Sequence, residues 1–512
     1  MEPIEGRWVR WFPWLSLAAF AILWLARWPS FPLLLDPSYH LFISQQALEA
    51  GGPLAYDWWE YAPVGRPHLY PPVLHLILCG LMRLGCPPFV AIRLISALVV
   101  PLVLVSLYLV MRRLLGFRVA LASLWMALVP FSWIVYLTGA LASPLALTEL
   151  LWLIVAVETR RVVAAGLLLG LMFYTHLGLP WVTLAFLAAY ALLKPGIRRT
   201  LLKSCWGLVL AVPWFVHVAR WSAYLQSTKR YGEQPLELSA AVFLLALIGA
   251  WRIWRSAQGP RWMVALWLGF LLMAQQFTFR WLSGEGLLPV VLLAGFGVEG
   301  LASRWTTSRG ARRYASLALA GLTGLTMLIP TLPLGKDGRF AWIDATPFHL
   351  LNVPGIRPHP LEVSLDVSLT EAAAQRLARM TGPREILWSN APYALGLLAV
   401  HARRATSLAM FYEVTPGAKD FDPVAAAHVI VWFKITPLPG QPSLRELLRR
   451  YPLKLVAEDE LMLVFRNPLA RELAHNPEAV IPFWLAFVVL CLVLGVVIGE
   501  FFRRPHLRED HG

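Results

Sequence analysis

Three polar side chains within one helical turn open the first long polar stretch of an otherwise apolar chain. Asp36, Tyr39 and His40 belong to the sequence DPSYH, which directly follows an apolar run. At spacings of three and four residues they share one face of a helix. A carboxylate held at a membrane surface could act as a general base or as a metal ligand. Asp before Pro is also typical of a helix N-cap, and the pattern by itself favours that structural interpretation.

A second polar cluster follows in the sequence DWWEY and continues into GRPHLYPP. Aromatic faces beside Asp57 and Glu60 suit a sugar, whose C–H face stacks on a ring while its hydroxyls form hydrogen bonds. They equally suit an aromatic belt at the membrane interface. Arg66, two residues before His68, could hold a phosphate bidentately or could pair with Asp57 or Glu60. Substrate binding and structural pairing therefore both stay open for these four residues.

Ionisable residues also occur within or beside the apolar runs, where they are costly and indicate function by default. Arg93, Glu149 and His176 are of this kind. Arg93 and His176 lie near the ends of their runs and could simply extend to the interface. Arg280 and Arg230 fall on the outer side, against the usual bias of cations toward the cytoplasm. These two arginines could bind the phosphate of a lipid at the outer leaflet.

The overall composition identifies the class of protein. With 512 residues, 58% of them hydrophobic and only 15% charged, and a mean hydropathy of +0.59, the chain is too apolar for a soluble protein. The net charge of +15 is typical of Lys and Arg gathered on the cytoplasmic side, and no separate basic domain indicates nucleic-acid binding. We therefore expect a polytopic membrane protein that contacts membrane lipids and no nucleic acid.

Twelve apolar runs are long enough to cross a bilayer, which takes roughly 17–25 residues. They fall at about 11–29, 88–111, 118–136, 142–159, 162–176, 178–194, 201–219, 237–254, 262–277, 286–302, 315–333 and 480–502. Clusters of Arg and Lys occur in every second connection, which places both termini in the cytoplasm and residues 30–87 and 334–479 outside. Residues 73–86 are interrupted by His75 and Arg83, so we expect a short helix in the outer interface there.

Residues 334–479 differ in composition from the rest of the chain. Helical patterns (TEAAAQRLARM, SLRELLRRY) alternate with β-rich runs (EILWSN, HVIVWFK, KLVAEDELMLVF), which predicts a small α/β domain. The expected fold is thus an all-α polytopic bundle with a small external α/β domain near the C-terminus. Residues 1–333 would form the transmembrane module with the external loop 30–87, and 480–512 the last span and a cytoplasmic tail.

In the order of its motifs the chain resembles the GT-C superfamily of integral-membrane glycosyltransferases, which take sugars from polyprenyl-phosphate or polyprenyl-diphosphate donors. DPSYH is similar to the DPxYH-type loop of oligosaccharyltransferase catalytic subunits, and HLYPPVLHLI looks like the proline-rich end of the first external loop. RLISALVVPLVLVSLYLVMRRLLG resembles the next span of the protein O-mannosyltransferase and aminoarabinose-transferase branch. AAGLLLGLMFYTHLG and FRWLSGEGLLPVVLLAGFGVEGL resemble later segments.

The resemblance covers roughly residues 10–330 and implies roles for single residues. It makes Asp36 a catalytic residue or metal ligand, matches His40 more weakly, and points to Arg93, His176 and Arg280. Two departures limit it. Residues 334–479 have no WWDYG-like motif, which speaks against peptide N-glycosylation. The loop YLTGALASPLA lacks the second metal-binding acid of oligosaccharyltransferases. A metal-independent mechanism is therefore favoured, with Mg²⁺ or Mn²⁺ at Asp36 the cofactor left open.

The resulting hypothesis is a glycosyltransferase that moves a sugar from a polyprenyl-phosphate donor to a lipid, glycan or protein acceptor on the outer face of the membrane. Asp36 would deprotonate the acceptor hydroxyl. Arg280, with Arg66 or Arg230, would hold the departing phosphate. The alternative is a non-catalytic polytopic protein that binds a lipid carrier, transports a solute or scaffolds an assembly.

Overall fold

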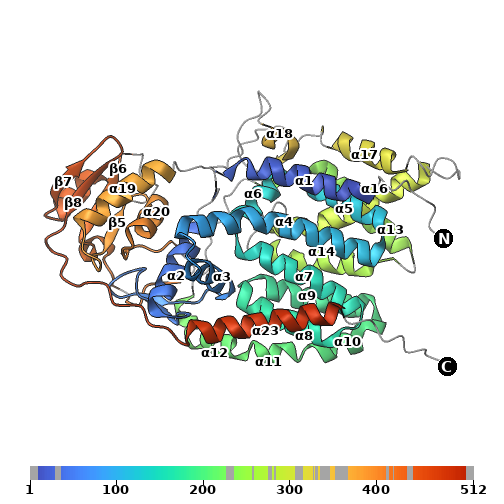
Figure 1. Cartoon of the computed structure of the whole chain (residues 1–512), viewed down its shortest axis with the longest axis horizontal. Helices are drawn as coiled ribbons and strands as arrows, with labels where there is room; N and C mark the ends of the chain where they lie inside the picture. Colours follow the sequence, from blue (N-terminus) through green and yellow to red (C-terminus); the bar gives the residue numbers. More distant parts are fainter. Residues whose placement is uncertain are drawn as a thin grey trace.

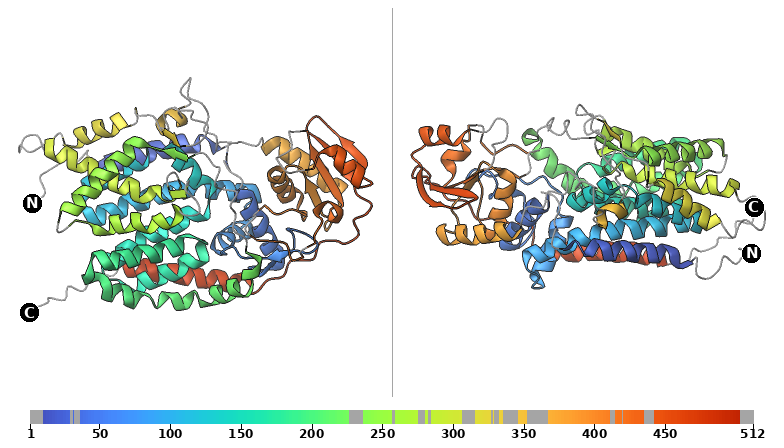
Figure 2. Two further views of the ribbon diagram at one scale, coloured as in Figure 1. Left: turned by 180° about the vertical axis from the view of Figure 1, so that it is seen from behind. Right: turned by 90° about the horizontal axis from the view of Figure 1, so that it is seen from above.

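An elongated bundle of helices and a small sheet domain make up the structure, which is a computed structural model (Figure 1). It describes residues 10–28, 31, 36–225, 236–256, 259–274, 280–281, 284–305, 315–326, 328, 332–334, 346–351, 367–410, 414–418, 420–434 and 442–502. The sheet domain lies beyond one end of the bundle, and the helices α2 (Asp36–Ala50) and α3 (Val73–Arg83) lie between the two (Figures 1 and 2).

The bundle helices pack together, most of them along its long axis (Figure 1), with α6 turned by 107° from α7. They are α1 (Phe12–Leu25), α4 (Pro88–Leu115), α5 (Phe117–Ala127), α6 (Phe131–Gly139), α7 (Ala142–Glu158), α8 (Val162–Thr175), α9 (Leu179–Leu193), α10 (Arg198–Ser204), α11 (Gly207–Leu210), α12 (Val212–Arg220), α13 (Ala240–Arg255), α14 (Arg261–Ala274), α16 (Leu287–Trp305), α17 (Ala315–Thr326) and α23 (Phe483–Phe502). A short helix, α18 (Thr346–Leu350), packs on α6.

Three helices of the described residues are long and apolar enough to cross a membrane: α4, residues 287–304 of α16, and α23. Two bent pairs, α6 with α7 at 107° and residues 195–210 with α12 at 53°, raise that number to at most five. The run 118–136, expected as one span, is divided between α5 and α6. Pro130, directly before α6, has no backbone N–H to continue the first helix. The total of twelve spans stays a prediction.

The helix α3 has the short form expected for residues 73–86. Its 11 residues would extend only about 16 Å at 1.5 Å per residue, half of the roughly 30 Å hydrocarbon core. One face of α3 packs against α2 and another against α23, and Leu74, His75 and Leu78 are buried. The helix α3 therefore packs against α2 and supports it, and α3 is too short to cross a bilayer by itself.

Close helix crossings in the bundle depend on glycine. A Cβ atom on Gly249 of α13 would lie 2.0 Å from the Leu293 carbonyl oxygen of α16, and one on Gly297 would lie 2.2 Å from the Leu245 carbonyl oxygen. Each helix thus presents a glycine to the backbone of the other. Small residues that let two backbones approach are the usual packing device of helices in lipid.

The sheet domain has the α/β composition that the sequence predicted. Its four strands are β5 (Leu387–Ser389), β6 (Val429–Phe433), β7 (Lys454–Glu458) and β8 (Met462–Arg466), in the order β5-β6-β8-β7. The pair β5–β6 is parallel, and the other two pairs are antiparallel. The helices are α19 (Val367–Met380), α20 (Pro392–Ala402), α21 (Pro423–Ala426) and α22 (Leu444–Arg450).

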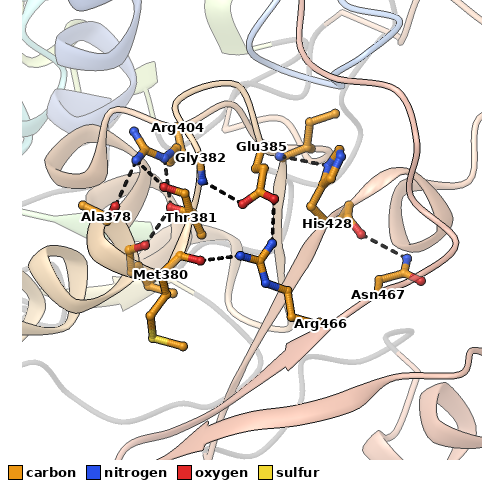
Figure 3. A network of polar contacts seen from close by, with 12 residues as sticks. Ala378, Met380, Thr381, Gly382, Glu385, Arg404, His428, Arg466 and Asn467 are labelled. Atoms are coloured by element: carbon orange, nitrogen blue, oxygen red, sulfur yellow. Dashed lines mark hydrogen bonds and ion pairs between the residues drawn. The ribbon is translucent and has the colours of Figure 1, made fainter.

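A polar network joins the helices of this domain to its sheet (Figure 3). The Arg466 Nη1 of β8 donates to the Glu385 Oε1 at 2.7 Å, and the Gly382 N–H donates to the other carboxylate oxygen at 2.8 Å. The Arg404 guanidinium donates to the carbonyl oxygens of Thr381 and Ala378 at the end of α19, at 2.8 and 3.1 Å. These contacts fix the domain's own geometry, so it can offer a firm surface to the loop beside it.

Backbone hydrogen bonds tie the sheet domain to the loop of residues 51–72, which we call the first polar loop. The Thr406 N–H donates to the Trp59 carbonyl at 2.7 Å, and the Ala62 N–H donates back to the Thr406 carbonyl at 2.9 Å. Farther along, the Gly417 N–H donates to the Gly65 carbonyl at 2.8 Å. The helix α2 also packs on α20. The loop and the domain are therefore one joined unit in this structure.

Candidate active site

Asp36 is the first residue of α2, and its surroundings differ from those of the rest of that helix. Its side chain is exposed, whereas Pro37 to Ala47 are buried. It accepts no hydrogen bond from the residues that the structure describes, so no capping bond is seen there. Desolvation by the protein around it raises the pKa of Asp36 to about 6; Arg280 opposes this rise and Glu285 adds to it. An accessible carboxyl with such a pKa can take up a proton near neutral pH.

Arg280 and Glu285, which precede α16, belong to this site. The Arg280 Nη1 lies 3.9 Å from the Glu285 Oε1, and the Arg280 side chain keeps 26% of its surface exposed while Glu285 is fully buried. The turn between them is tight, because a Cβ on Gly284 would lie 2.8 Å from the Arg280 Cα and 3.2 Å from the Tyr136 ring. The site thus holds one partly accessible cation between two carboxylates, those of Asp36 and Glu285.

A hydrogen-bonded chain fixes Glu285 from behind. The N–H groups of Gly178 and Leu179, at the start of α9, donate to the His176 Nδ1 at 3.0 and 3.1 Å. The neutral imidazole must then carry its proton on Nε2, which lies 3.1 Å from the Ser143 Oγ. Ser143 in turn donates to the Glu285 Oε1 at 2.8 Å. In this series of hydrogen bonds each donor has an acceptor, so the protons point in one direction, from His176 through Ser143 to Glu285.

Tyr39 and His40 belong to a buried group of aromatic rings. The His40 Nδ1 lies 3.0 Å from the His75 Nε2 of α3. The Tyr70 ring packs edge-on against both Tyr39 and His40, and the His68 ring lies tilted beside the His75 ring, with 5.4 Å between their centroids. Burial lowers the pKa values of His40 and His68 well below the usual range, so both imidazoles are neutral. This group supports the start of α2 from the first polar loop and α3.

Arg66 pairs with the carboxylates of Asp57 and Glu60. The sequence had left this pairing open beside the binding of a phosphate. Its guanidinium donates to Glu60, and its Nε lies 3.7 Å from the Asp57 Oδ2; all three side chains are at most 1% exposed. The Asp57 Oδ1 accepts the N–H groups of Trp59 and Glu60 at 3.0 and 3.1 Å. The Glu60 Oε1 accepts the Met410 N–H of the sheet domain at 2.6 Å. This triad stabilises the joint between loop and domain.

Arg93 and Glu149, which the sequence also singled out, each bond to a neighbouring segment. Arg93 donates to the Phe31 carbonyl at 3.0 Å. Glu149 of α7 accepts a hydrogen bond from the hydroxyl of Thr175 on α8 at 2.7 Å. Thr175 directly precedes His176. Arg230 lies outside the described residues. Sequence reasoning did not select Ser143, because a serine in an apolar run carries no signal until its partner is known.

An apolar cavity of about 490 Å³ lies beside the buried aromatic group, between α3, α8, α11, α12 and α23. Its walls include Leu76, Leu171, Trp214 and Leu490, and Tyr70 lines the end that adjoins Tyr39 and His40. Among the described residues that line it there is no Asp, Glu, Lys or Arg. Such a cavity suits a hydrocarbon chain and not a charged headgroup.

One family model and several solved structures are similar to this chain. The family model described as dolichyl-phosphate-mannose-protein mannosyltransferase matches residues 70–224. The structure of ArnT from Cupriavidus metallidurans bound to undecaprenyl phosphate is similar at 17% identity with a TM-score of 0.55, covering 90% of this chain and 99% of that one. That of the oligosaccharyltransferase AglB from Archaeoglobus fulgidus, with an inhibitory peptide and a dolichol-phosphate, is similar at 11% identity with a TM-score of 0.51, covering 84% and 70%. No curated protein sequence matches the chain.

Proposed function

We propose that this chain, a glycosyltransferase of the GT-C type by its family match and its fold, transfers a sugar from a polyprenyl phosphate to a cell-envelope acceptor on the outer face of a membrane. The predicted resemblance to GT-C enzymes and the predicted enzyme class are thus confirmed. The choice of donor, acceptor and site residues is the proposal.

One observation carries the proposal for the site. Asp36 is an exposed carboxyl that makes no capping bond with the described residues, at the head of an otherwise buried helix and facing Arg280. A residue that served only to start α2 would be expected to accept the free N–H groups of its first turn. Desolvation by the protein around Asp36 brings its pKa to about 6, near the pH at which a general base works best.

The proposed reaction is a displacement at the anomeric carbon. The acceptor hydroxyl attacks that carbon as Asp36 takes the hydroxyl proton, and the bond from the anomeric carbon to the phosphate oxygen breaks. The lipid phosphate leaves with the bonding electrons, and Arg280 neutralises the charge that develops on it. The apolar cavity beside Tyr70 would hold part of the isoprenoid chain. Tyr39, His40 and His68 would support the pocket wall.

The site residues from the sequence divide into two groups under this proposal. Arg280 and Asp36 would contact the reacting atoms, and His176 would act on them through Ser143 and Glu285. Asp57, Glu60 and Arg66 would position the loop, since they are buried against one another. Arg93 and Glu149 would hold helices in place, by the bonds to Phe31 and Thr175.

A divalent cation at Asp36 remains an open part of the proposal. Among the described residues no group of three or more His, Cys, Asp or Glu side chains is arranged to hold a metal ion. Mg²⁺ is commonly bound by one or two carboxylates together with water and a substrate phosphate, and the exposed Asp36 suits that arrangement. Transfer should therefore be measured with EDTA and again after Mg²⁺ or Mn²⁺ is added back; no step above depends on the ion.

For topology we propose twelve spans, cytoplasmic termini and an external domain at 334–479. The arrangement of the helices supports this orientation: α1 begins and α23 ends at the end of the bundle farthest from the sheet domain (Figure 1). Cysteines engineered into the sheet domain should react with an impermeant maleimide in intact cells. Labelling only after permeabilisation would show that the sheet domain lies in the cytoplasm, and the proposed orientation would be wrong.

The catalytic proposal is tested by Asp36→Asn, with a panel of labelled polyprenyl-phosphate sugars as donors and donor consumption as the readout. Asn keeps the size and the capping ability of Asp but cannot act as a base. We expect transfer to fall by about 10²- to 10⁴-fold. Asp422→Asn is the matched control, because Asp422 accepts the N–H groups of Val424 and Ala425 at the start of α21, away from the site. Full activity in Asp36→Asn would remove Asp36 from the reaction.

A further inference from the structure

The ion pair beside Asp36 joins a buried carboxylate, that of Glu285, to the partly exposed guanidinium of Arg280. Glu285 is fully buried and accepts the Ser143 hydroxyl at 2.8 Å. The Arg280 Nη1 stays 3.9 Å away, farther than a hydrogen bond, and a quarter of the Arg280 side chain is exposed. The carboxylate is therefore held inside the protein, whereas a ligand can reach the exposed part of the Arg280 side chain.

The hydrogen-bonded chain behind Glu285 makes its position independent of Arg280. The two backbone N–H groups at the start of α9 occupy the His176 Nδ1, so the protonated Nε2 faces Ser143. The Ser143 proton then goes to Glu285. If Arg280 moves to a phosphate, Glu285 keeps this bond and its place. If Arg280 leaves, the fully buried Glu285 carboxylate loses its cation and keeps the hydroxyl groups of Ser143 and Tyr136 as neutral partners.

An uncompensated buried carboxylate is costly, and its attraction for the nearest cation is strong. Arg280 therefore stands between two anions: the resident Glu285 and any phosphate that enters beside Asp36. The second carboxylate, Asp36, also faces this guanidinium. The Tyr136 hydroxyl interacts with both Arg280 and Glu285. A phosphate that binds here must share Arg280 with these groups.

We propose that Glu285 is the resident counter-ion of Arg280, which competes with the lipid phosphate for the guanidinium and thereby promotes release of the spent carrier. This inference rests on the proposed function, in which Arg280 receives the departing phosphate. Glu285 is a positioning residue in this scheme, since it acts through Arg280 and does not touch substrate. Its contribution is to turnover, by keeping the affinity for the product moderate.

The test measures the binding of undecaprenyl phosphate to the full chain in detergent. Glu285→Gln keeps the shape of the side chain and an acceptor for Ser143 but removes the competing charge. We expect the dissociation constant to fall about tenfold or more, since one unit charge near a phosphate contributes at least that much at an effective dielectric constant near 20. Arg280→Gln should weaken binding. In the Arg280→Gln background, Glu285→Gln should lose most of its effect, because the competition acts through Arg280.

Glu299→Gln is the matched control. Glu299 lies in the same helix region, α16, but its carboxylate pairs with Arg252, whose Nη1 is 3.5 Å from the Glu299 Oε2. Its dissociation constant should equal that of the wild type. Unchanged or weaker binding in Glu285→Gln, with weaker binding in Arg280→Gln, overturns the counter-ion role and leaves the phosphate role of Arg280 standing. Unchanged binding in Arg280→Gln overturns both. Activity of Asp36→Asn decides the catalytic role separately.

If Glu285→Gln does not yield folded protein, Glu285→Asp gives the same test. The shorter side chain keeps the charge but withdraws it from Arg280, so undecaprenyl phosphate should again bind more tightly, by a smaller factor. Unchanged or weaker binding in Glu285→Asp would count against the proposal in the same way.

Discussion

Replacing Arg66 by Met should destabilise the joint between the first polar loop and the sheet domain. The substitution keeps an apolar stem of similar length but removes the only cation that contacts the buried carboxylates of Asp57 and Glu60 among the described residues. Asp57 keeps two backbone N–H donors on Oδ1, whereas its Oδ2 loses its ion partner. Glu60 keeps the Met410 N–H and loses the guanidinium. Removing one partner of a buried ion pair costs about 3–5 kcal/mol.

The loss should grow with pH, because burial already raises the pKa of Glu60 and Arg66 opposes that rise. Without Arg66 the pKa of Glu60 rises further. A carboxyl with a raised folded-state pKa adds stability below its unfolded value, and that stability is lost as the pH rises through the folded value. Unfolding should be followed by tryptophan fluorescence during heating, at pH 6 and at pH 9, with the larger destabilisation at pH 9.

Two controls make this prediction sharp. In the Arg66→Met variant, a second change Glu60→Gln should recover part of the loss, because no buried charge is then left without a partner at that position. Arg450→Met removes an arginine that is 72% exposed in its pair with Asp422, so its effect should stay within about 1 kcal/mol. Unchanged thermal stability of Arg66→Met together with lost undecaprenyl phosphate binding would instead make Arg66 a ligand contact and refute the structural reasoning.

Three further predictions follow from single sites. Transfer should fall as the pH drops through about 6, the pKa to which desolvation by the surrounding protein raises Asp36. Arg280→Gln should move this acid limb to higher pH, because Arg280 lowers that pKa; a pH–rate profile checks both. For Glu385, burial would raise the pKa, but hydrogen bonds from Arg466 and from the Gly382 N–H outweigh it and hold the pKa below its usual value. Its stabilisation is therefore present above the unfolded pKa and lost as the pH falls through the folded one. Glu385→Gln should cost about 1 kcal/mol at pH 7 and nothing in strong acid, as thermal unfolding can show. Gly249→Val should destabilise the bundle by about 1–3 kcal/mol, whereas Gly324→Val, with open space around it, should leave the melting temperature unchanged.

Long uninterrupted apolar runs made most of the helical bundle predictable. The runs 142–159, 162–176 and 178–194 correspond closely to α7, α8 and α9, because each is bounded by charged, glycine or proline residues. The run 118–136 was not predicted correctly, since hydropathy does not register the loss of one N–H at Pro130. The β-rich runs of the α/β domain were predictable from their side chains. Their order β5-β6-β8-β7 was not, because pairing depends on contacts distant in the sequence.

The site was only partly predictable for the same reason. DPSYH drew attention to Asp36, and the charge bias of the loops drew attention to Arg280. The pairing of Arg66 with Glu60 was one of two alternatives that the sequence left open. Ser143 and His176 form a hydrogen-bonded chain to Glu285 only because α7, α8 and α9 come together there. The local sequence around these two residues does not predict that contact.

The hydrogen bonds between the first polar loop and the sheet domain have a practical consequence for chimeric enzymes. Trp59, Ala62 and Gly65 bond to Thr406 and Gly417, which lie more than three hundred residues later in the chain. A graft that exchanged only the C-terminal domain for that of a relative would leave half of this seam mismatched. A chimera that exchanges residues 367–479 should therefore exchange residues 51–72 with them, so that these hydrogen bonds are kept.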